Sequence, residues 1–261
     1  MKLSISNIAW DSSQNEKIYN IMIENNFNGL EIAPTKIFTN EPYTHLHEAK
    51  NWSRSLFKNY GLEISSMQSI WYGKREQIFG LETERQNLIN YTKQAIDFAS
   101  AIGCRNLVIG CPKNRNINSE KDYDVAIKFF KNIGEYAYNN GTCVSIEANP
   151  TIYGTNFIND TNSAIKLVKD VNSNGFKLNL DIGTMIQNNE EANILIDNVY
   201  LINHVHISEP YLEKIIERDI HKQMISILKN ENYDKFISIE MKEQADIKNI
   251  ISVIRYLKYT V

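Results

Sequence analysis

The chain has 261 residues, which is enough to bury a substantial core without disulfide bonds or a structural metal. A net charge of −3 with 43% hydrophobic residues is ordinary for a globular protein and argues against an obligate nucleic-acid-binding protein. Three cysteines without metal-type spacing, and the lack of an apolar run long enough for a signal peptide or a membrane span, predict a cytoplasmic protein with no membrane partner.

Short apolar segments alternate with amphipathic segments along the whole chain. In the amphipathic segments, such as the one from Leu88 to Ile102, apolar residues recur every three or four positions, which predicts helices with one apolar face. Eight short segments have the length and the β-branched composition of buried strands. They cover residues 3–10, 30–35, 63–71, 106–112, 143–150, 177–184, 202–210 and 236–242.

Glycines stand where predicted helices end and predicted strands begin. Five of them follow a helical pattern and should adopt the left-handed backbone that ends a helix: Gly29, Gly61, Gly103, Gly141 and Gly175. Because the same glycine position recurs five times, the pattern predicts a repeated strand–helix unit.

Eight strand–helix units in about 250 residues are typical of an α/β fold of one kind, the closed (β/α)8 TIM barrel. An open doubly wound sheet would need a glycine-rich phosphate loop after its first strand, and "AWDSSQN" contains no glycine. Because no linker interrupts the pattern, we expect one domain over residues 1–261. Residues 35–43 and 72–82 are predicted to be long loops on its functional face.

Four consecutive predicted strands end in a residue that could bind a metal ion. They are Glu147, Asp181, His206 and Glu240. A single such residue would more often form an ion pair or cap a helix, but four at equivalent positions lie where TIM-barrel active sites are built. Three carboxylates would repel one another unless a cation lay between them. This donor set favours Mn²⁺ or Mg²⁺, with Co²⁺ and Zn²⁺ as alternatives.

A second layer of polar residues stands two positions earlier on the same strands. It comprises Ser145, Asn179, His204 and Ser238. Since strand side chains alternate, these residues should point into the barrel beneath the four ligands and orient them. For His204, an equal alternative is a core histidine whose partner is the backbone.

The four strand-end residues, with the phrases "GLEIAP", "IEANP", "LDIGT", "HVHISEP" and "ISIEMK", make the chain resemble the xylose-isomerase-like TIM-barrel superfamily. Within it, the chain is similar to the sugar phosphate isomerase/epimerase group, which includes ketose 3-epimerases and inositol-catabolism isomerases. The resemblance implies that the four residues hold one divalent ion. It also implies that Glu147 and Glu240 remove and return a proton next to a substrate carbonyl, through an enediolate.

The resemblance is weaker in the residues that bind substrate. Ketose 3-epimerases usually carry a histidine, a glutamate and an arginine where this chain has Thr184, Tyr153 and Leu212. Those residues contact the sugar, so the pattern predicts a retained metal site with a different set of substrate contacts.

Candidate substrate-binding residues follow several of the predicted strands. Aromatic and acidic candidates are Trp10, Glu31, Trp71 and Tyr153, and basic candidates are Lys113, Arg115 and Lys242. Each alone would more often be a packed loop residue or a solvated surface charge. Together they predict a small, polar, carbohydrate-like substrate, and the basic residues favour an anionic one.

Three other functions remain open at this stage. A lyase or dehydratase acting on a keto-polyol would use the same metal site. An AP endonuclease similar to endonuclease IV would need more histidines than the five present. A metabolite-binding barrel without catalysis would fit the altered substrate residues. Members of the resembled group often form homo-oligomers, and no nucleic-acid partner is expected.

Overall fold

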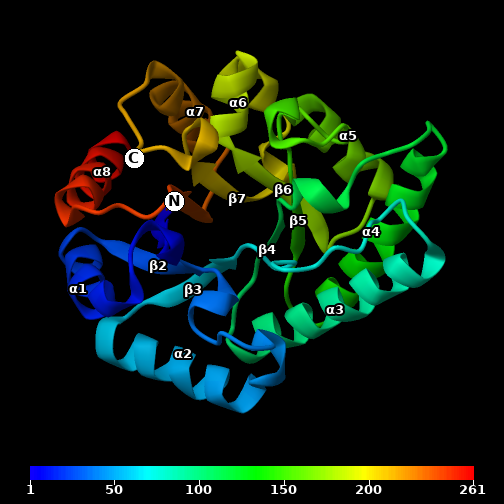
Figure 1. Cartoon of the computed structure of the whole chain (residues 1–261). Helices are drawn as coiled ribbons and strands as arrows, with labels where there is room; N and C mark the ends of the chain where they lie inside the picture. The colour runs from blue at the N-terminus through cyan, green and yellow to red at the C-terminus, as the bar shows by residue number, and fades with distance from the viewer.

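The computed structural model describes all 261 residues and forms a closed barrel of eight parallel strands surrounded by helices (Figure 1). The strands are β1 (Lys2–Ser6), β2 (Phe27–Ile32), β3 (Glu63–Met67), β4 (Leu107–Ile109), β5 (Val144–Glu147), β6 (Phe176–Asp181), β7 (Ile202–Ile207) and β8 (Phe236–Ile239). Each pairs with the next in sequence, and β1 pairs with β8 to close the barrel.

One helix follows each strand, so the predicted (β/α)8 barrel is confirmed. The helices are α1 (Asn15–Glu24), α2 (Leu46–Tyr60), α3 (Glu82–Ala101), α4 (Asp122–Asn139), α5 (Thr161–Val171), α6 (Ile182–Asn188), α7 (Asp219–Asn230) and α8 (Ile247–Thr260). No helix has both the length and the apolar character needed to cross a bilayer.

All eight predicted strand segments contain a strand, but every strand ends earlier than predicted. The segment predicted over 3–10, for example, stops being a strand at Ser6 and continues as a short 3-10 turn at Asn7–Ala9. The remaining residues of such segments form the loops at the C-terminal end of the barrel, which is where a TIM barrel carries its active site.

Three of the five glycines end helices with a left-handed backbone as predicted; they are Gly61, Gly103 and Gly141. The prediction was wrong for the other two, since neither has a positive φ. Gly29 lies inside β2, where a Cβ would stand 2.5 Å from the Phe236 ring. Gly175 packs against the carbonyl oxygen of Gly134. These two glycines are needed for close packing, and Asn26 (φ 63°) provides the left-handed residue after α1.

The apolar core lies between the sheet and the helices, whereas the barrel interior is polar. Ser4 and Ser65 share a hydrogen bond of 2.6 Å across the interior, and Asn106 accepts one of 2.6 Å from Ser145. TIM-barrel interiors are usually filled by branched apolar side chains. Buried polar groups need partners, so this interior is a connected hydrogen-bonded layer that can support charged residues above it.

Candidate functional site

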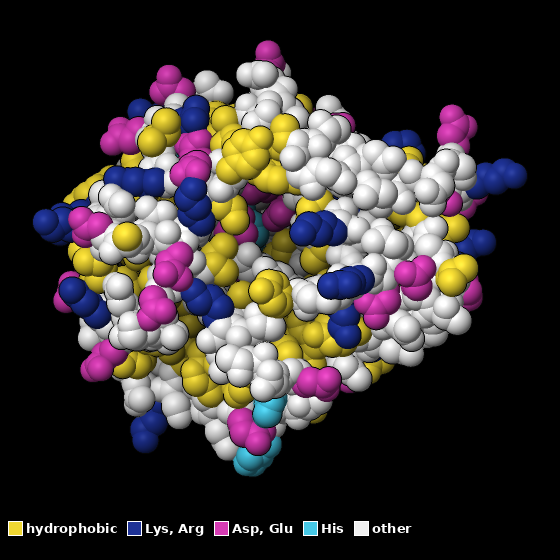
Figure 2. Space-filling view, in the orientation of Figure 1, with side chains coloured by type: hydrophobic (Ala, Val, Ile, Leu, Met, Phe, Trp, Pro, Cys, Tyr) yellow, Lys and Arg dark blue, Asp and Glu magenta, His cyan; other side chains and the backbone are white.

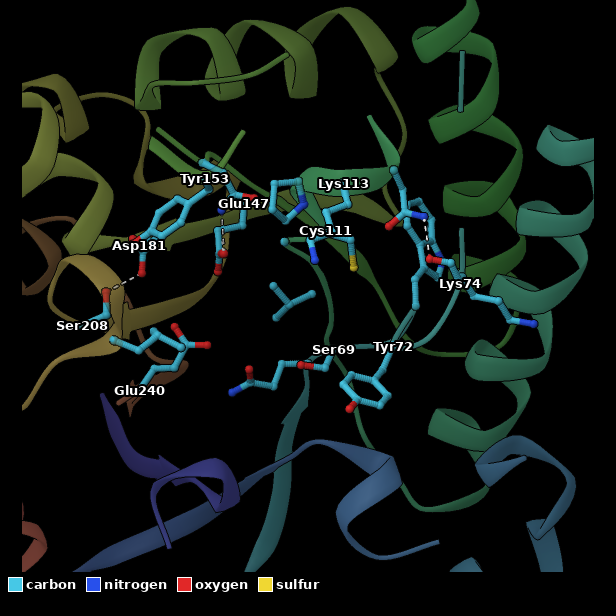
Figure 3. A pocket seen from close by; sticks show the side chains of 18 of the residues that line it. Ser69, Tyr72, Lys74, Cys111, Lys113, Glu147, Tyr153, Asp181, Ser208 and Glu240 are labelled. Carbon is cyan, nitrogen blue, oxygen red and sulfur yellow. Dashed lines mark hydrogen bonds between the residues drawn. The ribbon is translucent and has the colours of Figure 1, made fainter. Parts of the chain in front are cut away.

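The four predicted metal ligands come together at the C-terminal mouth of the barrel. One donor atom from each of Glu147, Asp181, His206 and Glu240 lies within 4.8 Å of the others. The carboxylates of Glu147, Asp181 and Glu240 face a shared space in Figure 3. Figure 2 shows the same region as a hollow with carboxylates and a histidine visible inside it.

His206 lies between carboxylates on both sides of its ring. Nδ1 is 3.0 Å from Oε2 of Glu147 and 3.1 Å from Oε2 of Glu240, while Nε2 is 2.9 Å from Oε1 of Glu31. Burial lowers the pKa of His206, but Glu240 and Glu31 outweigh it and raise that pKa well above its usual value.

Glu31 is fully buried beneath His206 and does not line the cavity. Its carboxylate accepts a hydrogen bond from Ser238 Oγ at 2.7 Å as well as from His206 Nε2. Burial raises the pKa of Glu31, but His206 and His204 lower it well below its usual value, so the carboxylate is ionised. The expectation that Glu31 contacts substrate is corrected: the side chain lies below the cavity, and its carboxylate faces Nε2 of His206, where it favours a proton.

The predicted supporting layer contacts the ligands unevenly. Asn179 Nδ2 donates to Glu147 Oε2 at 2.7 Å and lies 3.2 Å from His206 Nδ1. Ser238 acts through Glu31, and Ser145 bonds to Asn106 without touching a ligand. His204 Nε2 lies 3.7 Å from Glu31 and has no hydrogen-bond partner, so the backbone does not satisfy it.

Asp181 is held by two groups that were not predicted to be part of the site. Its Oδ1 accepts a hydrogen bond from the backbone N–H of Thr184 at 2.5 Å, and its Oδ2 accepts one from the hydroxyl of Ser208. Ser208 is placed in turn because it accepts from the backbone N–H of Gly183 at 2.9 Å. In the sequence, Ser208 was marked only by its position two residues after His206. Its contact with Asp181 depends on β7 lying beside β6, which no local pattern shows.

The donor set fits a divalent cation. Burial, and then the charge of Glu147, raise the pKa of Asp181 to about 6. Burial likewise raises the pKa of Glu240 to about 7, with His206 opposing and Glu147 and Asp181 adding to it. Three crowded carboxylate oxygens and an imidazole nitrogen facing the same space leave excess negative charge that a cation would neutralise.

Arg115 was a candidate for binding an anionic substrate, but its side chain is fully buried behind Glu147. Nη2 donates to the backbone oxygen of Glu147 at 2.8 Å and to Oδ1 of Asn149 at 2.6 Å. Asn149 Nδ2 lies 3.2 Å from Oε1 of Glu147. Burial lowers the pKa of Arg115 to about 10, so it stays charged near neutral pH and anchors the end of β5.

Two other substrate candidates also lie outside the cavity. Trp10 is fully buried, and its indole N–H donates to Asn15 at 2.8 Å, so it packs in the wall of the barrel. Lys242 forms an ion pair with Glu213 and does not line the cavity. The conformation of the loops decides whether these two side chains reach the cavity, and the alternation of residues along a strand does not predict that conformation.

The remaining candidates do line the cavity, which has a volume of about 620 Å³. Trp71 and Lys113 belong to its wall, together with Leu212 at the position of the missing arginine. Tyr153 also lines it and accepts a hydrogen bond from the backbone N–H of Tyr211 at 2.8 Å, which leaves its own hydroxyl proton free to donate. The functional loop predicted over 72–82 contributes Tyr72 to the wall (Figure 3).

Comparison with known sequences places the chain in a family. The profile of the xylose isomerase-like TIM barrel matches residues 22–259. The chain belongs to this family. No curated protein matches the chain.

Solved structures with the same fold include several sugar epimerases. The 3-keto-D-glucoside 4-epimerase of E. coli is 18% identical with a TM-score of 0.78, and the match covers 100% of both chains. The D-psicose 3-epimerase of Clostridium cellulolyticum H10, solved with D-tagatose, is 14% identical with a TM-score of 0.80 over 100% of this chain and 98% of the other. A family 2 AP endonuclease of Brucella melitensis is 18% identical with a TM-score of 0.77, covering 98% and 99%. At such identities the likeness establishes the fold alone.

Proposed function

We propose that the protein is a metal-dependent isomerase or epimerase that moves a proton next to the carbonyl group of a sugar, sugar phosphate or polyol ketone. The observation that carries the proposal is the convergence of Glu147, Asp181, His206 and Glu240 at the mouth of the barrel. The sugar epimerases among the solved structures support it, since they share the whole fold.

The four converging residues would hold one divalent ion, with Mn²⁺ or Mg²⁺ favoured by the three oxygen donors. When bound, such an ion polarises a carbonyl oxygen and so makes the neighbouring C–H more acidic. The fixed Nε2–H of His206, bonded to Glu31, keeps the imidazole in one tautomer and one orientation.

Glu147 and Glu240 are the residues that would transfer the proton. They extend from β5 and from the end of β8, and both approach Nδ1 of His206 from different strands. A substrate bound between them would have one carboxylate near each face. Burial raises the pKa of the Glu240 carboxyl, and enclosed carboxylates of this kind are used as general acids and bases.

The test is exchange of substrate carbon-bound protons with deuterium oxide, followed by NMR over a panel of sugars, sugar phosphates and polyol ketones with added Mn²⁺ or Mg²⁺. We expect the wild-type protein to exchange one proton. Glu147→Gln and Glu240→Gln should each abolish the exchange. Glu213→Gln, which removes an exposed carboxylate outside the cavity, serves as the control and should retain it.

Three other outcomes of this test would point to a different function. Loss of water from a keto-polyol would identify a lyase using the same residues. Incision of abasic-site DNA would identify an endonuclease. Stoichiometric metal binding with no exchange or turnover across the panel would indicate a binding protein without catalysis.

A further inference from the structure

The cavity is charged differently at its two ends. Glu147, Asp181 and Glu240 lie together at one end, and Lys74 lies at the other (Figure 3). Arg75, the next residue in the chain, also lines the cavity. A hexose has twelve non-hydrogen atoms, and at no more than roughly 30 Å³ for each it would take up about 360 Å³. The cavity of about 620 Å³ therefore has room for a group beyond the reacting carbons.

The basic end is built from two loops that are joined by a buried asparagine. Asn114 donates from Nδ2 to the backbone oxygens of Lys74 at 3.2 Å and Glu76 at 2.8 Å. A hydrogen bond also runs in the other direction between the two loops. Gln77, which follows Glu76 in the loop between β3 and α3, donates from Nε2 to the backbone oxygen of Lys113 at 2.8 Å. Arg75 and Lys113 are thus held on adjoining, mutually bonded segments rather than on independent loops.

Arg75 and Lys113 have no ion-pair partner, because neither has a carboxylate oxygen within 4.0 Å. Lys242 nearby is different, since it is paired with Glu213. Lys74 is partly satisfied because its ammonium lies 3.9 Å from the centroid of the Tyr91 ring. Two exposed cations without partners in a cavity wall are available to a bound anion.

The opposite end would reject an anion. Three carboxylates exceed the charge of one divalent ion, so that end stays negative even when a metal is bound. A substrate with an anionic group would therefore enter in one orientation only, with this group away from the reacting carbons. A neutral sugar would leave both cations unused and would gain no such orientation.

We infer that the substrate carries a phosphate or carboxylate group, which Arg75 and Lys113 bind on the side of the cavity formed by the two loops that Asn114 joins. The inference rests on the proposed function only in placing the reacting carbons beside Glu147 and Glu240. Together, the two charge-assisted contacts should make an anionic ligand about tenfold tighter than its neutral counterpart.

The test is isothermal titration calorimetry in the presence of Mn²⁺ with D-fructose, D-fructose 6-phosphate and D-glucuronate as probes. We expect at least one anionic probe to bind about tenfold more tightly than D-fructose. The advantage should disappear in the double variant Arg75→Gln/Lys113→Gln and persist in Lys242→Gln, which removes a paired cation outside the cavity. The two anionic probes distinguish phosphate from carboxylate.

Equal binding of all three probes, an anionic advantage that survives in the double variant, or affinities weaker than about 1 mM for both anionic probes would overturn the inference. Circular dichroism of the double variant excludes loss of the fold as the cause. Because binding needs no turnover, Glu240→Gln separates the two proposals. Selective anion binding with unchanged proton exchange in that variant would reject the catalytic proposal and leave the anion site intact.

Discussion

Glu31→Gln tests the arrangement beneath the proposed metal site. The substitution keeps the size of the buried side chain but replaces the carboxylate oxygen 2.9 Å from His206 Nε2 with a neutral amide. His206 then loses the ionised partner that holds its proton on Nε2. Ser238, whose hydroxyl donates to the other oxygen at 2.7 Å, can instead accept a hydrogen bond from the amide N–H. The amide can therefore bond to both neighbours, but it carries no negative charge to hold the proton on Nε2.

We expect this change to weaken metal binding by about 10- to 100-fold, the usual effect of removing a group that orients a metal-bound histidine. That loss corresponds to about 1.4–2.7 kcal/mol of binding free energy. The assay is competition for Mn²⁺ and Zn²⁺ with a chelating indicator, so it does not depend on knowing the substrate. Ser238→Ala, which leaves the carboxylate charge in place, should cost less than Glu31→Gln.

The control is Glu63→Gln, because Glu63 is half-exposed at the other end of the barrel and pairs only with Lys2. If Glu31→Gln bound both metals within about twofold of the wild-type affinity, Glu31 would not orient His206 and the reasoning would be wrong. An equal loss in Glu63→Gln would point instead to a general effect of charge.

Three further predictions concern metal linkage, packing and pH. Adding Mn²⁺ to the metal-free chain should stabilise it by about 2.7 kcal/mol at one hundred times the dissociation constant, measured as a rise in the thermal midpoint. Gly175→Ala should lower the free energy of unfolding in urea by about 3 kcal/mol, because the new Cβ would meet the backbone oxygen of Gly134 and lie 2.7 Å from the backbone nitrogen of Tyr138. Burial lowers the pKa of His221 in the folded chain to about 4, whereas the same histidine in the unfolded chain has a pKa of about 6.5. Between these two values, the unfolded chain binds a proton at His221 and the folded chain does not. Stability should therefore fall by about 2 kcal/mol between pH 7 and pH 5, and His221→Gln should remove that part of the dependence.

Each of these three predictions has its own control. Mg²⁺ and Ca²⁺ test metal selectivity, and an unchanged thermal midpoint with every divalent ion would reject the site. Gly141→Ala should cost only about 1 kcal/mol from its left-handed backbone, since its Cβ would meet no atom within 4 Å. His47→Gln, at an exposed position, should leave the pH dependence as it is in the wild type. A pH profile of His221→Gln identical to that of the wild type would show that another group controls it.

The burial of His221 could not be read from the sequence. This residue belongs to the amphipathic helix α7, and its side chain is fully buried with Nδ1 2.9 Å from the Tyr256 hydroxyl. Which side chains of α7 lie under α8 depends on how the two helices pack. Local periodicity carries no information on that contact.

The sequence by itself determined the eight strands, the helices between them and the four converging donors, because alternation and apolar spacing are local properties of a chain. Three of the residues that it offered as substrate contacts, Trp71, Lys113 and Tyr153, line the cavity.

Only the tertiary structure decided the depth and the partners of the other charged residues. Glu31 meets His206 across 175 positions of sequence, and Arg115 meets Asn149 across 34. Which layer of the barrel a side chain occupies depends on the stagger between neighbouring strands, and which loop residue reaches the cavity depends on contacts such as those of Asn114. These interactions exist only after distant segments have packed together, so no pattern within one segment can specify them.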